Sequence, residues 1–180
     1  MKNSTLFFVF TFLSLSINAQ DKMQTKTGKI TFEASISSFE EVKATNETAS
    51  CVLHLKTGKI ASLALIKGFR FKAALMEEHF NETYIESNTY PKATFKGKIE
   101  DFNWKNISST PKEYKLKGKL ELHGKSKEIT TTVTLIKVAD GLEMRSDFNV
   151  NSDDFDIAIP KPVSNKISKT INIKIEYIFH

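Results

Sequence analysis

The chain has 180 residues, a length that suits one domain with a substantial core. Its 26 lysine and arginine residues exceed its 21 acidic residues, which gives a formal net charge of +5. The lysines alternate with other residues, as in Lys115, Lys117 and Lys119, and this spacing is typical of a solvated sheet face rather than a nucleic-acid-binding surface. The single cysteine, Cys51, excludes an intramolecular disulfide and is expected to be a small buried side chain.

The first predicted element is a targeting segment over residues 1–19. Lys2 provides a positive start, residues 6–15 form an apolar stretch, and Ala19 is a small residue at the expected cleavage point. A stable membrane span is not expected, because it needs about twenty apolar residues. We therefore expect a secreted or periplasmic protein, with residues 20–180 as one mature domain.

Most of residues 20–180 are predicted to form β-strands. Apolar and polar residues alternate around Ile30, around Cys51, and over residues 60–66, 113–122, 128–138 and 167–179. Thr57-Gly58 and Asp140-Gly141 predict tight hairpin turns. No change of composition and no internal repeat divides these residues, so we expect a single domain.

A short helix around Met76 interrupts the strands. Leu75, Met76 and Phe80 would lie along one side of that helix. Tyr90 before Pro91 favours extended backbone, which ends the helical region and begins the next strand.

Eight or so strands joined by short turns can form a closed barrel or a sandwich, and periodicity alone does not choose between them. The long strands favour a barrel, because a barrel leaves no exposed edges. We therefore predict an all-β fold, an antiparallel β-barrel of about eight strands with one short helix.

The most specific pattern lies in residues 69–97, FRFKAALMEEHFNETYIESNTYPKATFKG. Its main pieces are Phe69-x-Phe71, Leu75-Met76, His79-Phe80, the Tyr-Ile-Glu-Ser of residues 84–87, and the Tyr-Pro-x-Ala-x-Phe-x-Gly of residues 90–97. Further pieces are Leu120-x-x-His123-Gly124-x-x-Lys127 and Asp153-Asp154-Phe155-x-Ile157. Over most of residues 28–178 the chain resembles the YceI-like family, often described as lipid- or polyisoprenoid-binding. The resemblance implies a lipocalin-like barrel with a long apolar cavity.

The expected ligand is a hydrophobic isoprenoid-type lipid, such as a polyprenyl or quinone chain. Binding would come from burial without catalysis, at about 0.8 kcal/mol per buried methylene group. We expect the helix near Met76 to cover one end of the cavity. The residues expected to line the cavity are Phe69, Phe71, Met76, Phe80, Tyr84, Phe95, Leu120, Leu122 and Phe148.

A filled barrel is the alternative. A barrel of about eight strands is just wide enough for its own side chains to fill it, so the phenylalanines also fit a packed core. Such a barrel would act as a stress or adhesion module that binds a protein partner, and exposure of Trp104 or Phe39 would favour it. Both hypotheses are compatible with a homodimer.

Candidate sites for catalysis or metal binding are weak in this sequence. Asp153, Asp154 and Asp156 lie in a polar turn, and Glu77, Glu78 and Glu82 are expected on the solvent side of the helix. Adjacent surface acids in similar surroundings do not divide into an acid and a base. The four histidines show no metal-ligand spacing, and no Gly-x-Ser-x-Gly motif is present. We expect no enzyme activity, no metal and no cofactor.

Overall fold

The computed structural model describes residues 21–37 and 39–180, and the targeting segment predicted over residues 1–19 lies outside them. The strands of the described part are β1 (Lys22–Ser35), β2 (Lys43–His54), β3 (Lys59–Leu65), β4 (Arg70–Phe71), β5 (Lys92–Ile99), β6 (Lys112–Leu122), β7 (Lys125–Val138), β8 (Gly141–Asn151) and β9 (Ile167–Phe179). The helical elements are α1 (Ala74–His79), the π-turn η2 (Phe80–Tyr84), and the 3-10 turns η1 (Ile66–Gly68), η3 (Trp104–Asn106), η4 (Ser152–Phe155) and η5 (Lys161–Val163).

Eight of the strands close into an antiparallel barrel. The order runs β1, β2, β3, β5, β6, β7, β8, β9, and β9 pairs again with β1. The short β4 pairs only with β2 and lies outside this ring. Closure removes the exposed edges that a sheet of this length would otherwise present. The prediction of an all-β, lipocalin-like antiparallel barrel with one short helix is confirmed.

Local turn chemistry explains the strand connections. The β6–β7 turn consists of His123 and Gly124, with φ of 50° and 71°. Positive φ at both central residues is what a two-residue type I′ turn requires, and its twist matches that of the flanking strands. The predicted hairpins at Thr57-Gly58 and Asp140-Gly141 are also present, between β2 and β3 and between β7 and β8.

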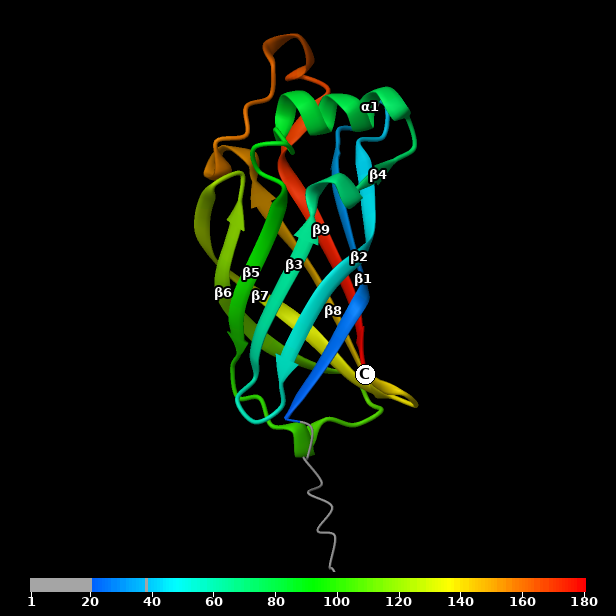
Figure 1. The fold of residues 1–180 in the computed structure, drawn as a ribbon, viewed down its shortest axis with the longest axis vertical. Helices are drawn as coiled ribbons and strands as arrows, with labels where there is room; N and C mark the ends of the chain where they lie inside the picture. Colours follow the sequence, from blue (N-terminus) through cyan, green and yellow to red (C-terminus); the bar gives the residue numbers. More distant parts are fainter. Residues whose placement is uncertain (1–20, 38) are drawn as a thin grey trace, which may run out of the picture.

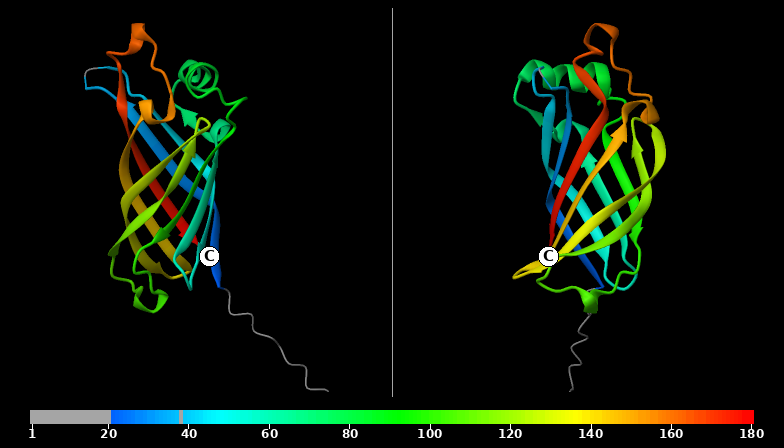
Figure 2. Two further views of the ribbon diagram at one scale, coloured as in Figure 1. Left: turned by 90° about the vertical axis from the view of Figure 1, so that its left-hand side faces the viewer. Right: turned by 180° about the vertical axis from the view of Figure 1, so that it is seen from behind.

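The helix and the segment of residues 156–167 lie at one end of the barrel, which we call the α1 end (Figure 1). The turn that contains η3 lies at the opposite end, and Figure 2 shows the same arrangement from two further sides. The barrel axis therefore runs from the α1 end down to the η3 end.

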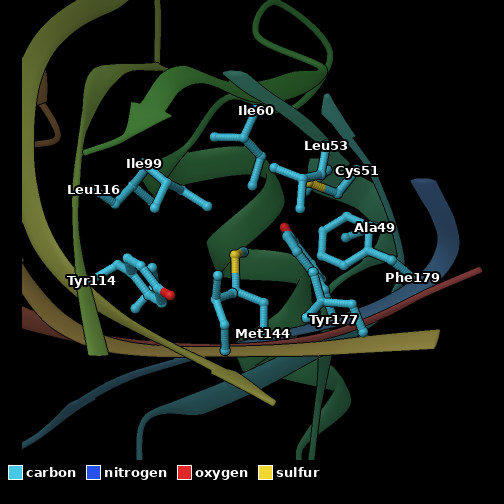
Figure 3. Packing of buried hydrophobic residues seen from close by; sticks show 14 of the residues in the cluster. Ala49, Cys51, Leu53, Ile60, Ile99, Tyr114, Leu116, Met144, Tyr177 and Phe179 are labelled. Carbon is cyan, nitrogen blue, oxygen red and sulfur yellow. The ribbon is translucent and has the colours of Figure 1, made fainter. Parts of the chain in front are cut away.

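Buried side chains pack together inside the barrel, and we call them the buried cluster (Figure 3). Most of them lie on the strand ends next to η3, such as Ile99 at the end of β5 and Tyr114 near the start of β6. The cluster includes Cys51, which is 1% exposed as the sequence predicts. Other members are Ala49, Leu53, Ile60, Ile99, Tyr114, Leu116, Val133, Leu135, Leu142, Met144, Tyr177 and Phe179. Trp104 is half-buried against this cluster, so it is not an exposed aromatic residue. The η3 end is thus the solid part of the barrel.

Candidate ligand-binding cavity

The α1 end of the barrel contains a cavity of about 660 Å³. Its wall is mostly apolar and comes from nearly every strand, from α1 and η2, and from residues 157–167. All nine residues expected from the sequence lie in this wall: Phe69, Phe71, Met76, Phe80, Tyr84, Phe95, Leu120, Leu122 and Phe148. Their contact with a ligand stays a prediction.

The floor of the cavity is the top of the buried cluster. Met144 and Tyr177 belong to both, and the Tyr177 hydroxyl lies 2.6 Å from the Ser62 hydroxyl. Burial raises the pKa of the Tyr177 phenol. Gly28 on β1 allows the tyrosine ring to lie flat against the backbone, since a Cβ atom there would stand 2.4 Å from the ring. The floor is therefore tightly packed and closed.

The side wall has apolar surface that no neighbour covers. Ile171 and Ile173 on β9 and Phe148 on β8 point into the barrel, yet they are only half-buried. Phe95 lies over the paired glycines Gly97 and Gly118, where Cβ atoms would stand 2.8 Å and 2.6 Å from its ring. A packed core would cover such side chains, so this surface is available to an apolar ligand.

Four phenylalanines form an aromatic cluster beneath the helical segment. The ring centroid of Phe32 lies 5.3 Å from that of Phe69, 5.6 Å from that of Phe71 and 5.2 Å from that of Phe80. Aromatic rings at these separations attract each other beyond the area they bury. The cluster joins β1 to β4 and η2, and thereby holds the helical segment over the cavity.

Glu77 fastens the same segment from its other side. One carboxylate oxygen lies 2.8 Å from an Arg70 guanidinium nitrogen, and the other accepts a hydrogen bond from the Phe71 backbone N–H at 3.1 Å. The expectation that Glu77 faces solvent is wrong, because the α1 turn directs its side chain back onto β4. A charged acceptor bonded to two donors is a stronger link than a neutral one.

A second fastening joins three segments that are far apart in the sequence. His123 Nδ1 lies 2.9 Å from the Phe155 carbonyl oxygen, and His123 Nε2 lies 3.1 Å from a Glu86 carboxylate oxygen. Both partners are acceptors, so the ring makes both hydrogen bonds when both nitrogens carry hydrogen. Tyr90 packs edge-on against the imidazole at 4.4 Å between centroids. We call Glu86, Tyr90, His123 and the Phe155 carbonyl the His123 latch.

Much of the wall was not identified from the sequence. The missed residues include Ile30, Phe32, Ala34, Phe39, Ile60, Ser62, Ala64, Met144, Ile157, Ile159, Val163, Ile171, Ile173, Ile175 and Tyr177. The alternation over residues 167–179 contains the signal for β9, since its odd-numbered apolar residues form one face. Residues 157–163 have no such periodicity, and only the fold brings them to the cavity. Phe39 is 45% exposed and lies at the rim.

The three aspartates near η4 that were considered for catalysis are engaged with lysines. Asp153 lies 2.8 Å from Lys169, Asp154 forms an ion pair with Lys127, and Asp156 lies 2.7 Å from Lys125. The hydrogen bond from Lys125 lowers the pKa of Asp156. Within residues 21–37 and 39–180, no group of three or more His, Cys, Asp or Glu side chains is placed to hold a metal ion.

None of the helices in the described residues has both the length and the apolar character needed to cross a membrane.

The chain resembles a known family in sequence and several solved structures in fold. Residues 1–179 match the family described as the YceI-like domain. A polyisoprenoid-binding domain from Saccharophagus degradans has a similar fold, with a TM-score of 0.77 at 12% identity over 89% of this chain and 98% of that one. BcnA from Burkholderia cenocepacia gives a TM-score of 0.68 at 15% identity, covering 83% and 94% of the two chains. A YceI protein from Campylobacter jejuni gives 0.59 at 18% identity, covering 99% and 98%. No curated protein matches the chain.

Proposed function

Because the chain belongs to the family of YceI-like domains, we propose that it binds and carries a hydrophobic isoprenoid-type lipid, such as a polyprenyl or quinone chain, without catalysing a reaction. The single observation that supports this most is the cavity itself, about 660 Å³ in volume and lined mostly by apolar side chains. Cavities of this size are typical of small-molecule sites. The naming of a fold relative as a polyisoprenoid-binding domain points to the same ligand class.

The proposed mechanism is burial in a preformed site. Each methylene group moved from water into the cavity contributes about 0.8 kcal/mol. Ile171, Ile173 and Phe148 already present uncovered apolar surface, so the wall does not need to reorganise before a chain enters. A preformed site reduces the ordering cost that binding otherwise carries.

Two features support a carrier rather than an enzyme. The acids near η4 are occupied by lysines, so they do not form a pair with divided roles. The wall hydroxyls of Ser62 and Ser146 form hydrogen bonds with the Tyr177 hydroxyl and the Thr132 carbonyl oxygen rather than with a base, which is not the arrangement that activates a nucleophile. We also propose secretion or a periplasmic location, on the basis of the sequence of residues 1–19.

The filled-barrel alternative is less well supported. It predicts side chains packed solidly through the barrel, whereas the α1 end encloses open space. Phe39 is exposed as that alternative requires, but it belongs to the rim of the cavity and is therefore explained by ligand entry.

Mass spectrometry of lipids extracted from native protein tests the proposal. The protein should be purified from its own cells without detergent and extracted with organic solvent, and a prenyl-type lipid should appear in near-stoichiometric amount. An extract without lipid, together with failure of the delipidated protein to take up any prenyl alcohol or quinone, would contradict the proposed function.

A further inference from the structure

Lysine side chains form a continuous surface on one side of the barrel. The strands β3, β5 and β6 lie side by side (Figure 1), and exposed positions alternate with covered ones along each of them. The lysines at these exposed positions are Lys59 on β3, Lys92, Lys96 and Lys98 on β5, and Lys115, Lys117 and Lys119 on β6. We call this surface the lysine face.

Strand register places several of these lysines directly opposite one another. Lys98 on β5 is the partner of Lys59 on β3 and of Lys117 on β6. In the next row, Lys96 is the partner of Lys119. Like charges at directly opposite positions of a sheet repel and reduce its stability. The barrel therefore keeps these lysines at a cost, and they do not serve to hold its strands together.

The opposite side of the barrel pairs its charges by contrast. It consists of β8, β9 and β1, which lie across the ring from β3, β5 and β6. Glu176 lies opposite both Lys29 and Arg145, and Lys174 lies opposite Asp147. The ammonium of Lys29 is 4.0 Å from Glu176, and that of Lys174 is 3.9 Å from Asp147. A merely solvated side of this barrel thus alternates in sign, which the lysine face does not.

The lysine face carries the net charge of the barrel. Residues 21–180 have a formal net charge of +4, because Lys2 is the only charged residue that precedes them. The acids on the same three strands and just after β5 are Glu100, Glu113 and Glu121. Seven lysines against three glutamates leave an excess of four positive charges here, so the remaining charges of residues 21–180 balance. The face ends at β7, where Glu128 lies opposite Lys119.

Exposed apolar side chains adjoin the lysines. Leu63 and Leu65 on β3 are 36% and 56% exposed, and Val52 on the neighbouring β2 is 37% exposed. Leu65 lies opposite Lys92, so an apolar and a cationic side chain stand together at the α1 end of the face. Anionic bilayers attract both kinds of group, because lysines meet the headgroups and apolar side chains enter the boundary with the acyl chains.

The chemistry of the face fits a lipid surface better than a nucleic acid. Among the exposed positions of β3, β5 and β6, all of them described by the structure, no aromatic side chain is present on which a base could stack. The same positions include no arginine, the side chain that binds a phosphate with two parallel hydrogen bonds. Lysine acts as a point charge, which suits headgroups that have no fixed arrangement.

We propose that the lysine face, together with Leu63 and Leu65, docks the protein reversibly onto an anionic bilayer surface. This inference goes beyond the proposed function, which concerns the cavity, and it does not depend on what the cavity holds. The docked surface adjoins the cavity, because Leu65 is followed directly by Ile66 of η1, a residue of the cavity wall. Docking would therefore bring the α1 end of the barrel close to the bilayer.

Co-sedimentation with vesicles of defined composition tests the docking. The purified protein is mixed with vesicles of phosphatidylcholine alone, or with vesicles of phosphatidylcholine and phosphatidylglycerol. We expect it to bind the anionic vesicles and to stay in solution with the neutral ones. Binding should weaken as salt is added, because ions screen exposed charges.

Two matched double variants locate the docking surface. Lys96→Gln with Lys98→Gln removes two charges from the lysine face, and Lys29→Gln with Lys174→Gln removes two from the opposite side. A lysine near an anionic surface increases affinity roughly fivefold, so the first variant should bind about 25-fold more weakly than the second. Lys96 and Lys98 both lie opposite other lysines, so their loss relieves repulsion and should leave the fold intact.

A second matched pair tests the apolar part. Leu65→Gln should weaken binding to anionic vesicles several-fold, because a polar side chain loses the gain from leaving water. Ile178→Gln is the control, since Ile178 is similarly exposed, at 49%, but lies on β9 across the barrel. It should bind as wild type does.

The outcomes separate docking from the function of the cavity. Equal sedimentation of wild-type protein with neutral and anionic vesicles would overturn the inference, as would equal binding by the two double variants. Retention on DNA or on an acidic protein without binding to anionic vesicles would also overturn it, because the face would then have another class of partner. Uptake of a prenyl alcohol by delipidated protein reports the proposed function separately, and Lys96→Gln with Lys98→Gln should leave that uptake unchanged.

Discussion

The imidazole Nε2 atom of His123 lies 3.1 Å from a carboxylate oxygen of Glu86, a contact between residues 37 positions apart in the sequence. It joins the β6–β7 turn to the segment that leaves η2. The imidazole is held from its other side by the Phe155 carbonyl oxygen, so one ring connects three parts of the cavity rim. The helical segment that lies over the cavity is therefore held by specific contacts at both ends. Glu77 links it to β4, and the His123 latch holds its other end.

Replacing His123 by alanine should loosen the rim. The His123 side chain is 10% exposed, and its loss leaves the Phe155 carbonyl without this partner, which costs about 1–3 kcal/mol of unfolding free energy. Hydrogen exchange should accelerate in residues 80–90 relative to β7. His180→Ala is the control, since His180 is exposed and contacts Asp140 at the opposite end of the barrel. Equal exchange in residues 80–90 for both variants would argue against the latch.

Filling the cavity from its wall should block binding without unfolding the barrel. Ala93 on β5 lies in the cavity wall and is only half-buried, so a phenylalanine there would extend into open space rather than into packed atoms. We expect Ala93→Phe to lose most lipid uptake and to melt within a few degrees of wild type. Ala61→Phe, on the exposed face of the neighbouring strand β3, should bind normally. Normal uptake by Ala93→Phe would mean that lipid binds elsewhere.

A charge in the side wall should separate ligand binding from folding. In Phe148→Asp the carboxylate can stay hydrated in the empty cavity, whereas an apolar ligand would displace that water at a cost of several kcal/mol. The variant should therefore fold, as judged by circular dichroism, and should purify without lipid. Phe148→Leu preserves the apolar surface and should reduce affinity only modestly. Lipid bound to both variants in equal amount would contradict the assigned wall.

Cys51 should be chemically silent in the folded protein. Burial raises the pKa of its thiol, so the reactive thiolate is scarce throughout the physiological range. Labelling with a thiol reagent at neutral pH should be slow in native protein and rapid once denaturant unfolds the barrel. Rapid labelling under native conditions would show that β2 opens locally at this position.

The acids near η4 should be dispensable for binding. Changing Asp153 and Asp154 together to asparagine removes ion pairs with Lys169 and Lys127, and exposed pairs of this kind contribute about 1 kcal/mol or less each. Lipid content should be unchanged, and the melting temperature should fall by a few degrees at most. Loss of a measurable hydrolytic activity in this double variant would restore an enzymatic function to consideration.

The sequence predicts the strands well because alternation and turn chemistry are local. His123-Gly124, Thr57-Gly58 and Asp140-Gly141 occur where the structure has turns. Closure of the barrel depends on the pairing of β1 with β9, which joins residues such as Ile30 and Ile175, and no local pattern encodes that contact.

The cavity is predictable only in part for the same reason. Leu120, Leu122 and Phe148 follow from the inward side of single strands. The inward residues of β9 become part of the wall through their register with β8, in which Phe148 lies opposite Ile173. The His123 latch joins residues 32 and 37 positions apart, so only the folded chain brings its members together.

The closed floor fixes how deep an apolar ligand can reach into the barrel. Met144 and Tyr177 end the open space, and the next inward position on a strand lies two residues away, about 5 Å along the axis. Shortening Met144 to alanine would deepen the open space on the β8 side of the floor, while Tyr177 still closes the opposite side, at a stability cost of about 2–5 kcal/mol. The depth that an apolar chain can reach is set by the first inward residue that touches a neighbour across the barrel. A single substitution at that residue changes this depth without changing the residues at the open end of the cavity.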